Sequence, residues 1–393
     1  MRPPFCIVIR FSSQTEFTFS TASYREAASI RKEKMERQDR NLAFMLRYEN
    51  IAWYDEGCVR ILDRRCYPAR VHFVECRRHE EVRNAIRDMV TQSAGPYTAA
   101  PMGMALAAWE CRDKSGREQI EYLRKASECI SSARPTTKKR MELLTEASVE
   151  AARIALEEGR RADEAIRDYT IEANNLRYSK IHTMSEYLVE KFPDGGTVMT
   201  QCFGETIVGM MLRECLRKGK AVRLFCPETR PYFQGARLTA TVCHEMGFDT
   251  TVITDNMPAF VMANEGVDVF TCAADAITCD GYVFNKVGTS QIAICAAYYG
   301  VPVYVTGAPD IGHPTHDTVT IEMRNPGESL EAMGVRTAVE GVRGYYPAFD
   351  MTPPELITGI VTEKGIFPPQ SVSDYFALDG DGEYSYRAGK EEN

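Results

Sequence analysis

Residues 197–226 read TVMTQCFGETIVGMMLRECLRKGKAVRLFC. Two short apolar runs, at 197–200 and 222–226, flank a segment at 205–218 that has the character of a helix. Because this alternation repeats downstream, the sequence predicts a parallel sheet with right-handed crossovers. Further strands are predicted at Thr250–Thr254, Asp268–Cys272 and Pro302–Thr306, and further helices at 235–247, 256–264 and 287–299.

The sequence before Pro193 is dominated by helical periodicity, after short strand-like runs at 47–76. Amphipathic or Ala/Met-rich helices are predicted at Glu80–Val90, Ala99–Arg112, Arg117–Ile130, Thr136–Glu158 and Ala162–Phe192. We therefore expect an α/β protein with a mainly helical N-terminal domain containing small β elements (47–192). A Rossmann-like, doubly wound catalytic domain (193–370) follows. We also expect an N-terminal extension (1–46) that contains a small hairpin at 6–20 and a helix at Arg25–Arg40. The C-terminal residues 371–393 are predicted to form a flexible acidic tail.

The composition is that of a globular chain of 393 residues with a net charge of −8, which argues against a broad nucleic-acid footprint. The 13 cysteines include no CxxC pair, as expected for buried thiols in a reducing compartment. No signal peptide is apparent, and the most apolar stretch, 292–305, is too short to span a bilayer. These features predict a cytoplasmic protein without a membrane or nucleic-acid partner.

Ligands of such sheets bind beyond the carboxyl ends of the strands, so the residues after each strand are the candidates. Cys202 follows the first strand and precedes a helix, whose dipole would lower the thiol pKa. This position suits a nucleophile or base, although Cys202 also reads as one more core cysteine. Asp275 follows the fourth strand among small apolar neighbours, where desolvation would raise its pKa and make it a general acid.

Other strand ends carry polar residues. Gln234 and Gly235 would begin a helix whose free N–H groups hold an anion, unless the charged loop before them is merely solvated. Asp255 is either a site residue or a helix cap. Lys286, which follows Asn285, is predicted at a helix start. A cation there opposes the helix dipole, so we expect a ligand or a carboxylate to offset its charge.

Two remaining signals concern metals and nucleotides. His313 and His316, with neighbouring aspartates, could bind a metal, but they lie in a proline-containing loop, and the expectation is that no metal is used. The absence of GxGxxG and GxxxxGK[ST] loops weakens the case for dinucleotide or Walker-type nucleotide binding.

Five segments together resemble a known family. They are Glu228–Pro231, Gln234–Ala240, Ile253–Met257, Asn285–Thr289 and Pro347–Pro353. In these the chain is similar to the methylthioribose-1-phosphate isomerases, a family that shares its fold with ribose-1,5-bisphosphate isomerases and with regulatory subunits of translation initiation factor 2B. The resemblance covers residues 47–368. It implies a homodimer, a helical domain before a Rossmann-like domain, and a catalytic cysteine and aspartate at Cys202 and Asp275.

The implied activity is an aldose–ketose isomerisation without cofactor. An aldose 1-phosphate is locked as a ring, so an acid must act at the ring oxygen while hydrogen moves from C2 to C1. Asp275 is the expected acid and Cys202 the expected base, with a hydride shift as the alternative route. The candidate substrate contacts are Arg134, Gln234, Gly235, Asn285 and Lys286, and Arg134 and Lys286, with Lys138 and Lys139, are the cations that could take the place of an arginine that the family has and this chain lacks.

The chain departs from the family at ligand-facing motifs. An arginine-containing phosphate motif is replaced by Thr91–Pro96, in which Gln92 is the candidate contact, and Phe203 and Glu205 stand beside the cysteine in place of the family's residues. Phe203 either makes the pocket more apolar or packs under the helix. The departures leave three hypotheses: an isomerase of a 5-modified ribose 1-phosphate, an isomerase of the free sugar or another pentose phosphate, and a non-catalytic regulatory subunit. Candidate sugars are 5-methylthioribose, 5-deoxyribose 1-phosphate and ribose 1,5-bisphosphate.

Overall fold

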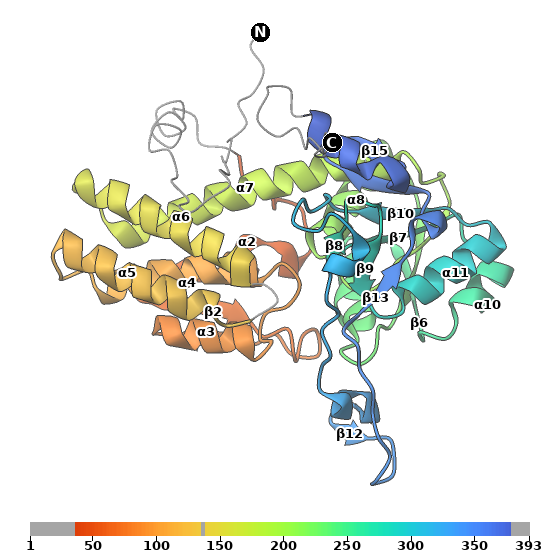
Figure 1. Cartoon of the computed structure of the whole chain (residues 1–393), viewed down its shortest axis with the longest axis horizontal. Helices are drawn as coiled ribbons and strands as arrows, with labels where there is room; N and C mark the ends of the chain where they lie inside the picture. The colour runs from red at the N-terminus through yellow and green to blue at the C-terminus, as the bar shows by residue number, and fades with distance from the viewer. Residues whose placement is uncertain (1–35, 135–137, 379–393) are drawn as a thin grey trace, which may run out of the picture.

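A computed structural model describes residues 36–134 and 138–378. It has the predicted α/β architecture, with a mainly helical N-terminal part and a C-terminal part built on a largely parallel sheet (Figure 1). The long helix α7 (Ala162–Val189) runs from the helical part to the sheet and packs against α8 (Thr206–Lys218). No helix among the described residues is both long enough and apolar enough to cross a membrane.

The helical part is organised around α4 (Pro96–Glu110), which is buried on nearly all sides because its residues are small or apolar. Gly103 permits close packing, since a Cβ there would come within 2.9 Å of Val82. The five predicted helices are confirmed to within a few residues at each end. The remaining helices of this part are α3 (His79–Arg87), α5 (Gly116–Ser131) and α6 (Lys138–Glu157).

The segment at 36–62 leads into the helical part. The predicted hairpin and most of the predicted helix at Arg25–Arg40 fall outside the described residues, while 36–40 form a turn instead of a helix. The turn is held because Arg37 donates to Asp39 and Glu49, and Asp39 accepts the N–H of Tyr48 at 2.8 Å. It leads to η1 (Phe44–Leu46), α2 (Tyr48–Ile51) and the antiparallel strands β1 (Ala52–Asp55), β2 (Cys58–Leu62) and β3 (Phe73–Cys76).

The main sheet has seven strands in the order β15-β14-β10-β7-β4-β5-β6, parallel except for the β14–β15 pair. Its crossovers run outward in both directions from β4, so the switch point lies between the paired strands β4 and β7. The strands are β4 (Thr197–Met199), β5 (Arg223–Pro227), β6 (Asp249–Ile253), β7 (Val269–Ala273), β10 (Val303–Thr306), β14 (Gly359–Thr362) and β15 (Gly365–Phe367). The helices that follow α8 are α9 (Ala240–Glu245), α10 (Pro258–Glu265) and α11 (Thr289–Tyr299).

A second, small sheet was not predicted. It pairs β8 (Ala276–Ile277), β9 (Val283–Lys286) and β13 (Phe349–Thr352) antiparallel, in the order β13-β9-β8. Between β10 and β13 the chain forms an arm, residues 320–348, which carries β11 (Glu331–Ala332) and β12 (Val335–Arg336) and projects from the body (Figure 1). Strands this short leave too little periodicity for a sequence pattern to detect.

Both ends of the described chain pack against the body. Leu42, Met45 and Leu46 are buried in a core shared with α7 and α8. At the other end, Pro369–Leu378 forms helical turns with Val372 fully buried, although a flexible tail was predicted from residue 371. The difference arises because Val372 and Tyr375 cover the apolar side of β14 and β15.

Candidate active site

Cys202 and Asp275 follow neighbouring strands of the main sheet. Strand β4 leads to Cys202 and β7 leads to Asp275, and these two strands pair at the switch point. The negative charge of Asp275 acts on the Cys202 thiol, which shows that the two groups are within electrostatic range. The fold therefore brings both residues predicted to carry the chemistry to the place where open α/β sheets bind ligands.

Cys202 has a left-handed backbone with φ of 59°. Its N–H donates to Thr229 Oγ1 at 3.2 Å, and its carbonyl accepts from the Thr239 hydroxyl. Helix α8 begins only at Thr206, and a helix dipole fades within one turn. Burial raises the pKa of Cys202 to about 11, against the opposing charge of Lys286. The predicted low thiol pKa is therefore wrong, and the thiol is neutral in the unliganded protein.

Asp275 lies between β7 and β8, where its N–H donates to the Phe284 carbonyl at 2.9 Å. Its side chain is open to solvent on one side, while protein surrounds it elsewhere. Desolvation raises the pKa of Asp275, and the nearby charges of Lys286 and Arg324 oppose that shift. The predicted direction is confirmed, and its cause is the predicted one.

Asn285 and Lys286 end strand β9 rather than opening a helix. This corrects the prediction, because α11 begins only at Thr289, and Asp350 holds the N–H groups of Gly288 and Ser290 at its start. Lys286 is almost completely buried, and burial lowers its pKa. Its Nζ lies 3.3 Å from the Tyr346 hydroxyl, and its charge acts on both Cys202 and Asp275.

The loop after β5 does not begin an ordinary helix. Gly235 opens a π-helical turn, η3 (Gly235–Thr239), and passes so close to β5 that a Cβ would lie 1.8 Å from the Pro227 carbonyl oxygen. The Ala236 N–H is already bound to the Glu228 carbonyl at 3.3 Å, which removes one of the expected free donors. Gln234 is buried, and its Oε1 accepts no hydrogen bond from the residues that the structure describes. That orphaned acceptor makes Gln234 a candidate ligand contact.

Asp255 clamps the same loop. Its two carboxylate oxygens accept the N–H groups of Thr229 and Arg230, each at 2.7 Å. Asp255 was predicted to be either a site residue or a helix cap. In the structure it does not cap a helix but holds the loop after β5. Arg237, in the same loop region, donates to the carbonyls of Arg64 and Tyr67, which ties the loop to the helical part.

Two predicted contact residues, Glu205 and Phe203, pack into the joint between the two parts, whereas the side-chain Oε1 of Gln92 has no partner among the described residues. Glu205 is completely buried, with Oε1 bound to Arg64 at 2.8 Å and Oε2 to the Ala94 N–H at 2.5 Å. Phe203 packs in the core, as its alternative interpretation predicted. Gln92 is buried, its Nε2 donates to Met89 O at 3.3 Å, and its carbonyl accepts from Arg64. A position next to Cys202 in the sequence does not show whether a side chain faces the site. The backbone of Glu205 has a positive φ, and its side chain reaches Arg64 in the helical part.

Two arginines outside the main sheet, Arg134 and Arg324, are within electrostatic range of each other, and Arg324 acts on the site. Arg134 follows α5 and contacts the Met89 sulfur. Burial lowers the pKa of Arg134, and the charge of Arg324 lowers it further. Arg324, on the arm, was not a predicted residue, and its charge also acts on Asp275 and Lys286. No sequence signal marked it, since it is separated from every strand of the main sheet.

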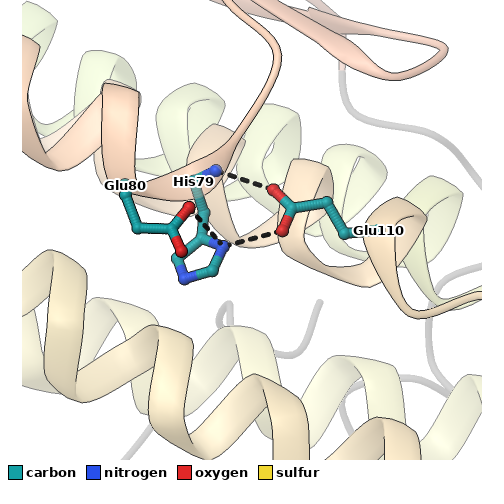
Figure 2. A group of neighbouring side chains, drawn as sticks. All are labelled: His79, Glu80 and Glu110. Atoms are coloured by element: carbon teal, nitrogen blue, oxygen red, sulfur yellow. Dashed lines mark hydrogen bonds and ion pairs between the residues drawn. The ribbon is translucent and has the colours of Figure 1, made fainter.

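The histidines outside the site contact neighbouring carboxylates and hydroxyl groups of the protein. His316 Nδ1 lies 2.9 Å from Asp280, whereas His313 contacts Thr318, so these histidines have separate partners. Figure 2 shows His79 between Glu80 and Glu110, a geometry that could also hold a cation. Here Glu110 accepts both the N–H of His79 at 2.7 Å and the Tyr122 hydroxyl at 2.6 Å. The group ties the start of α3 to the end of α4.

Comparison with known proteins gives one family match, to the initiation factor 2 subunit family over residues 95–369. The chain is 34% identical to methylthioribose-1-phosphate isomerase 1 of Pseudothermotoga lettingae, over 79% of this chain and 92% of the relative. It is 33% identical to a 5-deoxyribose 1-phosphate isomerase of Clostridium botulinum, with the same coverage.

Among solved structures, the chain is similar to translation initiation factor eIF-2B, subunit delta, from A. fulgidus. The TM-score is 0.70 at 31% identity, and the match covers 81% of this chain and 95% of that one. A 5-methylthioribose 1-phosphate isomerase from Pyrococcus horikoshii OT3 shares the fold as well, with a TM-score of 0.71 at 29% identity over 83% of this chain and 94% of that one.

Proposed function

Since the chain belongs to the initiation factor 2 subunit family, we propose that it is an aldose–ketose isomerase that converts a 5-modified ribose 1-phosphate to the ribulose 1-phosphate. The observation that carries the proposal is the site at the switch point. A thiol and a carboxyl lie within electrostatic range of each other, Lys286 acts on both, and Arg324 acts on Asp275 and on the neighbouring Arg134. A sugar needs the first two groups, and a phosphate monoester attracts the cations.

In this proposal Cys202 and Asp275 act on C1, C2 and the ring oxygen. The ring opens with the phosphate attached, and hydrogen moves from C2 to C1, so that no external oxidant or reductant is consumed. Arg134, Lys286, Asn285, Gln234 and the backbone at Gly235 hold the phosphate and the hydroxyl groups. The unpaired Oε1 of Gln234 supports a hydroxyl partner, because buried acceptors are normally satisfied.

The protonation of the pair bears on the route. Burial raises the pKa of Cys202 to about 11, so the thiol favours its neutral form before substrate binds, and desolvation also raises the pKa of Asp275. A neutral thiol and the Asp275 carboxyl can polarise the substrate oxygens while hydride passes directly from C2 to C1. This favours the hydride route over proton abstraction by a thiolate, which would need a strongly lowered thiol pKa.

The cations favour a phosphorylated over a free sugar. Arg134 and Arg324 repel each other in the unliganded protein, and burial removes water that would screen them. A phosphate dianion relieves that repulsion, whereas a neutral sugar does not. The 5-substituent, methylthio or hydrogen, is the part of the substrate on which the isomerase relatives differ by name.

The test is proton NMR of the purified protein in deuterated water with methylthioribose 1-phosphate, 5-deoxyribose 1-phosphate and free methylthioribose. Ketose formed only from the phosphate esters, and abolished in Cys202→Ser and Asp275→Asn, is the expected result. Product without deuterium at C1 indicates the hydride route. Turnover of the free sugar alone would replace the proposed substrate, and no turnover with any pentose would leave the regulatory-subunit alternative suggested by the family.

The homodimer and the cytoplasmic location are part of the same proposal. Large apolar side chains are exposed on the arm and on α10 and α11, as on surfaces that associate. They include Met333, Val339, Phe260 and Tyr298. Light scattering that gives twice the mass of 44.2 kDa would support the dimer, and a mass of one chain would refute it.

A further inference from the structure

Arg324 is fixed in place by backbone pairing. Its N–H donates to the Tyr346 carbonyl at 2.9 Å, and Met323 forms an antiparallel bridge with Pro347. The chain then continues into β13, where Phe349 pairs with Lys286. The segments of Arg324 and Lys286 therefore pair with successive residues of the same stretch, 346–352.

The side chains of these two cations converge on one ring. Arg324 Cζ lies 5.9 Å from the centre of the Phe349 ring, and Lys286 Nζ lies 5.2 Å from the same centre. Arg324 also lies 5.9 Å from the Tyr232 ring, in the loop after β5 that carries Gln234. The guanidinium is thus placed between the two groups of residues that form the site.

The direction of the guanidinium is set by Glu322. Arg324 Nε donates to one carboxylate oxygen at 3.1 Å, and the second oxygen lies 3.5 Å from Nη2. A single carboxylate, itself about one-third exposed, thus partners Arg324 while Lys286 and Arg134 lie nearby. The charge of Arg324 also acts on Asp275, and that of Lys286 acts on both Asp275 and Asp350.

We propose that Arg324, aimed by Glu322, is a substrate-binding residue that binds the phosphate group together with Lys286 and Arg134. This inference rests on the proposed function for the identity of the sugar, but not for the anion. A planar guanidinium matches two phosphate oxygens at once, whereas an ammonium provides a point charge. Arg324 therefore selects phosphorylated over free sugars.

The experiment measures binding and turnover separately. Inorganic phosphate and the phosphate esters are titrated by calorimetry into the native protein, Arg324→Ala, Arg324→Lys and the control Arg336→Ala. Arg336 is on the same arm but exposed, and it donates to the carbonyls of Ala338 and Val339. We expect phosphate affinity to fall about 10- to 100-fold in Arg324→Ala and less in Arg324→Lys, with no change in the control.

In turnover, Arg324→Ala should raise KM for the ester by a similar factor, with kcat changed less. Unchanged phosphate affinity and KM in a folded Arg324→Ala would overturn the inference while leaving the isomerase proposal intact. Should no sugar turn over in the native protein, lost phosphate binding in Arg324→Ala would still support the anion site. If Arg324→Ala unfolds, Arg324→Lys decides by the same affinity comparison, and an affinity equal to the native value then counts against a bidentate contact.

Discussion

The two sides of the switch point use their polar residues differently. On the β4–β5 side, Glu205 and Asp255 have both carboxylate oxygens bound by protein donors. On the side formed by the small sheet and the arm, Asp275, Lys286 and Arg324 act on one another through space, and the prominent partner of Arg324 is Glu322. The polar groups on the β4–β5 side hold the loops in place, whereas the charged groups on the side of the small sheet and the arm remain available for a ligand.

This difference suggests a criterion for distinguishing the residues that stabilise the fold from those that act on a ligand. Groups whose hydrogen bonds are satisfied within the protein should affect unfolding when they are changed. Groups that remain desolvated and incompletely paired should affect activity, and their removal should cost little stability. The predictions below test that division, from the largest effect to the smallest.

Asp275→Asn should lower kcat/KM about 10²- to 10⁴-fold, the usual contribution of a positioned acid or base. Stability should not fall. A carboxyl with a raised pKa contributes stability while it is protonated, and that contribution is lost as the pH rises through the folded pKa. The free energy of unfolding of the variant, which carries a neutral amide, should therefore be equal to or higher than that of the native protein at pH 7. Steady-state kinetics and thermal unfolding measure both, with Asp317→Asn, an exposed aspartate, as control. A clear loss of stability would contradict the division.

Glu205→Gln should destabilise the protein by about 3–5 kcal/mol, because it leaves Arg64 buried without its counter-charge. Urea unfolding measures the loss. The matched control is Glu228→Gln on the same side of the site, where burial and Asp255 raise the carboxyl pKa, so that the amide should be neutral or stabilising. Equal losses in the two variants would show that the buried pair is not what holds the joint.

Gly235→Ala should cost about 1–3 kcal/mol by overpacking, since the added methyl must displace the Pro227 carbonyl. Because that movement shifts Gln234, KM should rise as well. Gly116→Ala is the control, as its added Cβ meets nothing within 4 Å. Denaturant unfolding and KM measured on both variants would show whether the close approach at Gly235 matters for both properties.

Glu110→Gln, far from the site, should cost about 1.5 kcal/mol at neutral pH and leave kcat/KM unchanged. Although burial opposes the shift, hydrogen bonds from His79 and Tyr122 hold the pKa of Glu110 below its usual value. A lowered folded pKa contributes stability above the unfolded pKa and loses it as pH falls through the folded pKa. The difference between native and variant in unfolding free energy should therefore vanish in acid. A difference that persists at low pH would contradict this assignment.

The sequence by itself determined the parallel sheet, the five helices of the N-terminal part and the positions of Cys202 and Asp275. Local periodicity specifies such elements, and the strand-end rule depends only on their order. It also predicted the raised pKa of Asp275, because small apolar neighbours are local in sequence.

Only the tertiary structure decided the thiol pKa, the role of Glu205 and the place of Arg324. Burial of Cys202 outweighs any helix dipole, and α8 begins too late for that dipole to act. Glu205 meets Arg64 and Arg324 meets Lys286 through backbone turns and short strands that bring distant segments together. For Cys202, Glu205 and Arg324, desolvation and ion pairing depend on those long-range contacts, which the residues adjacent to them in the sequence do not reveal.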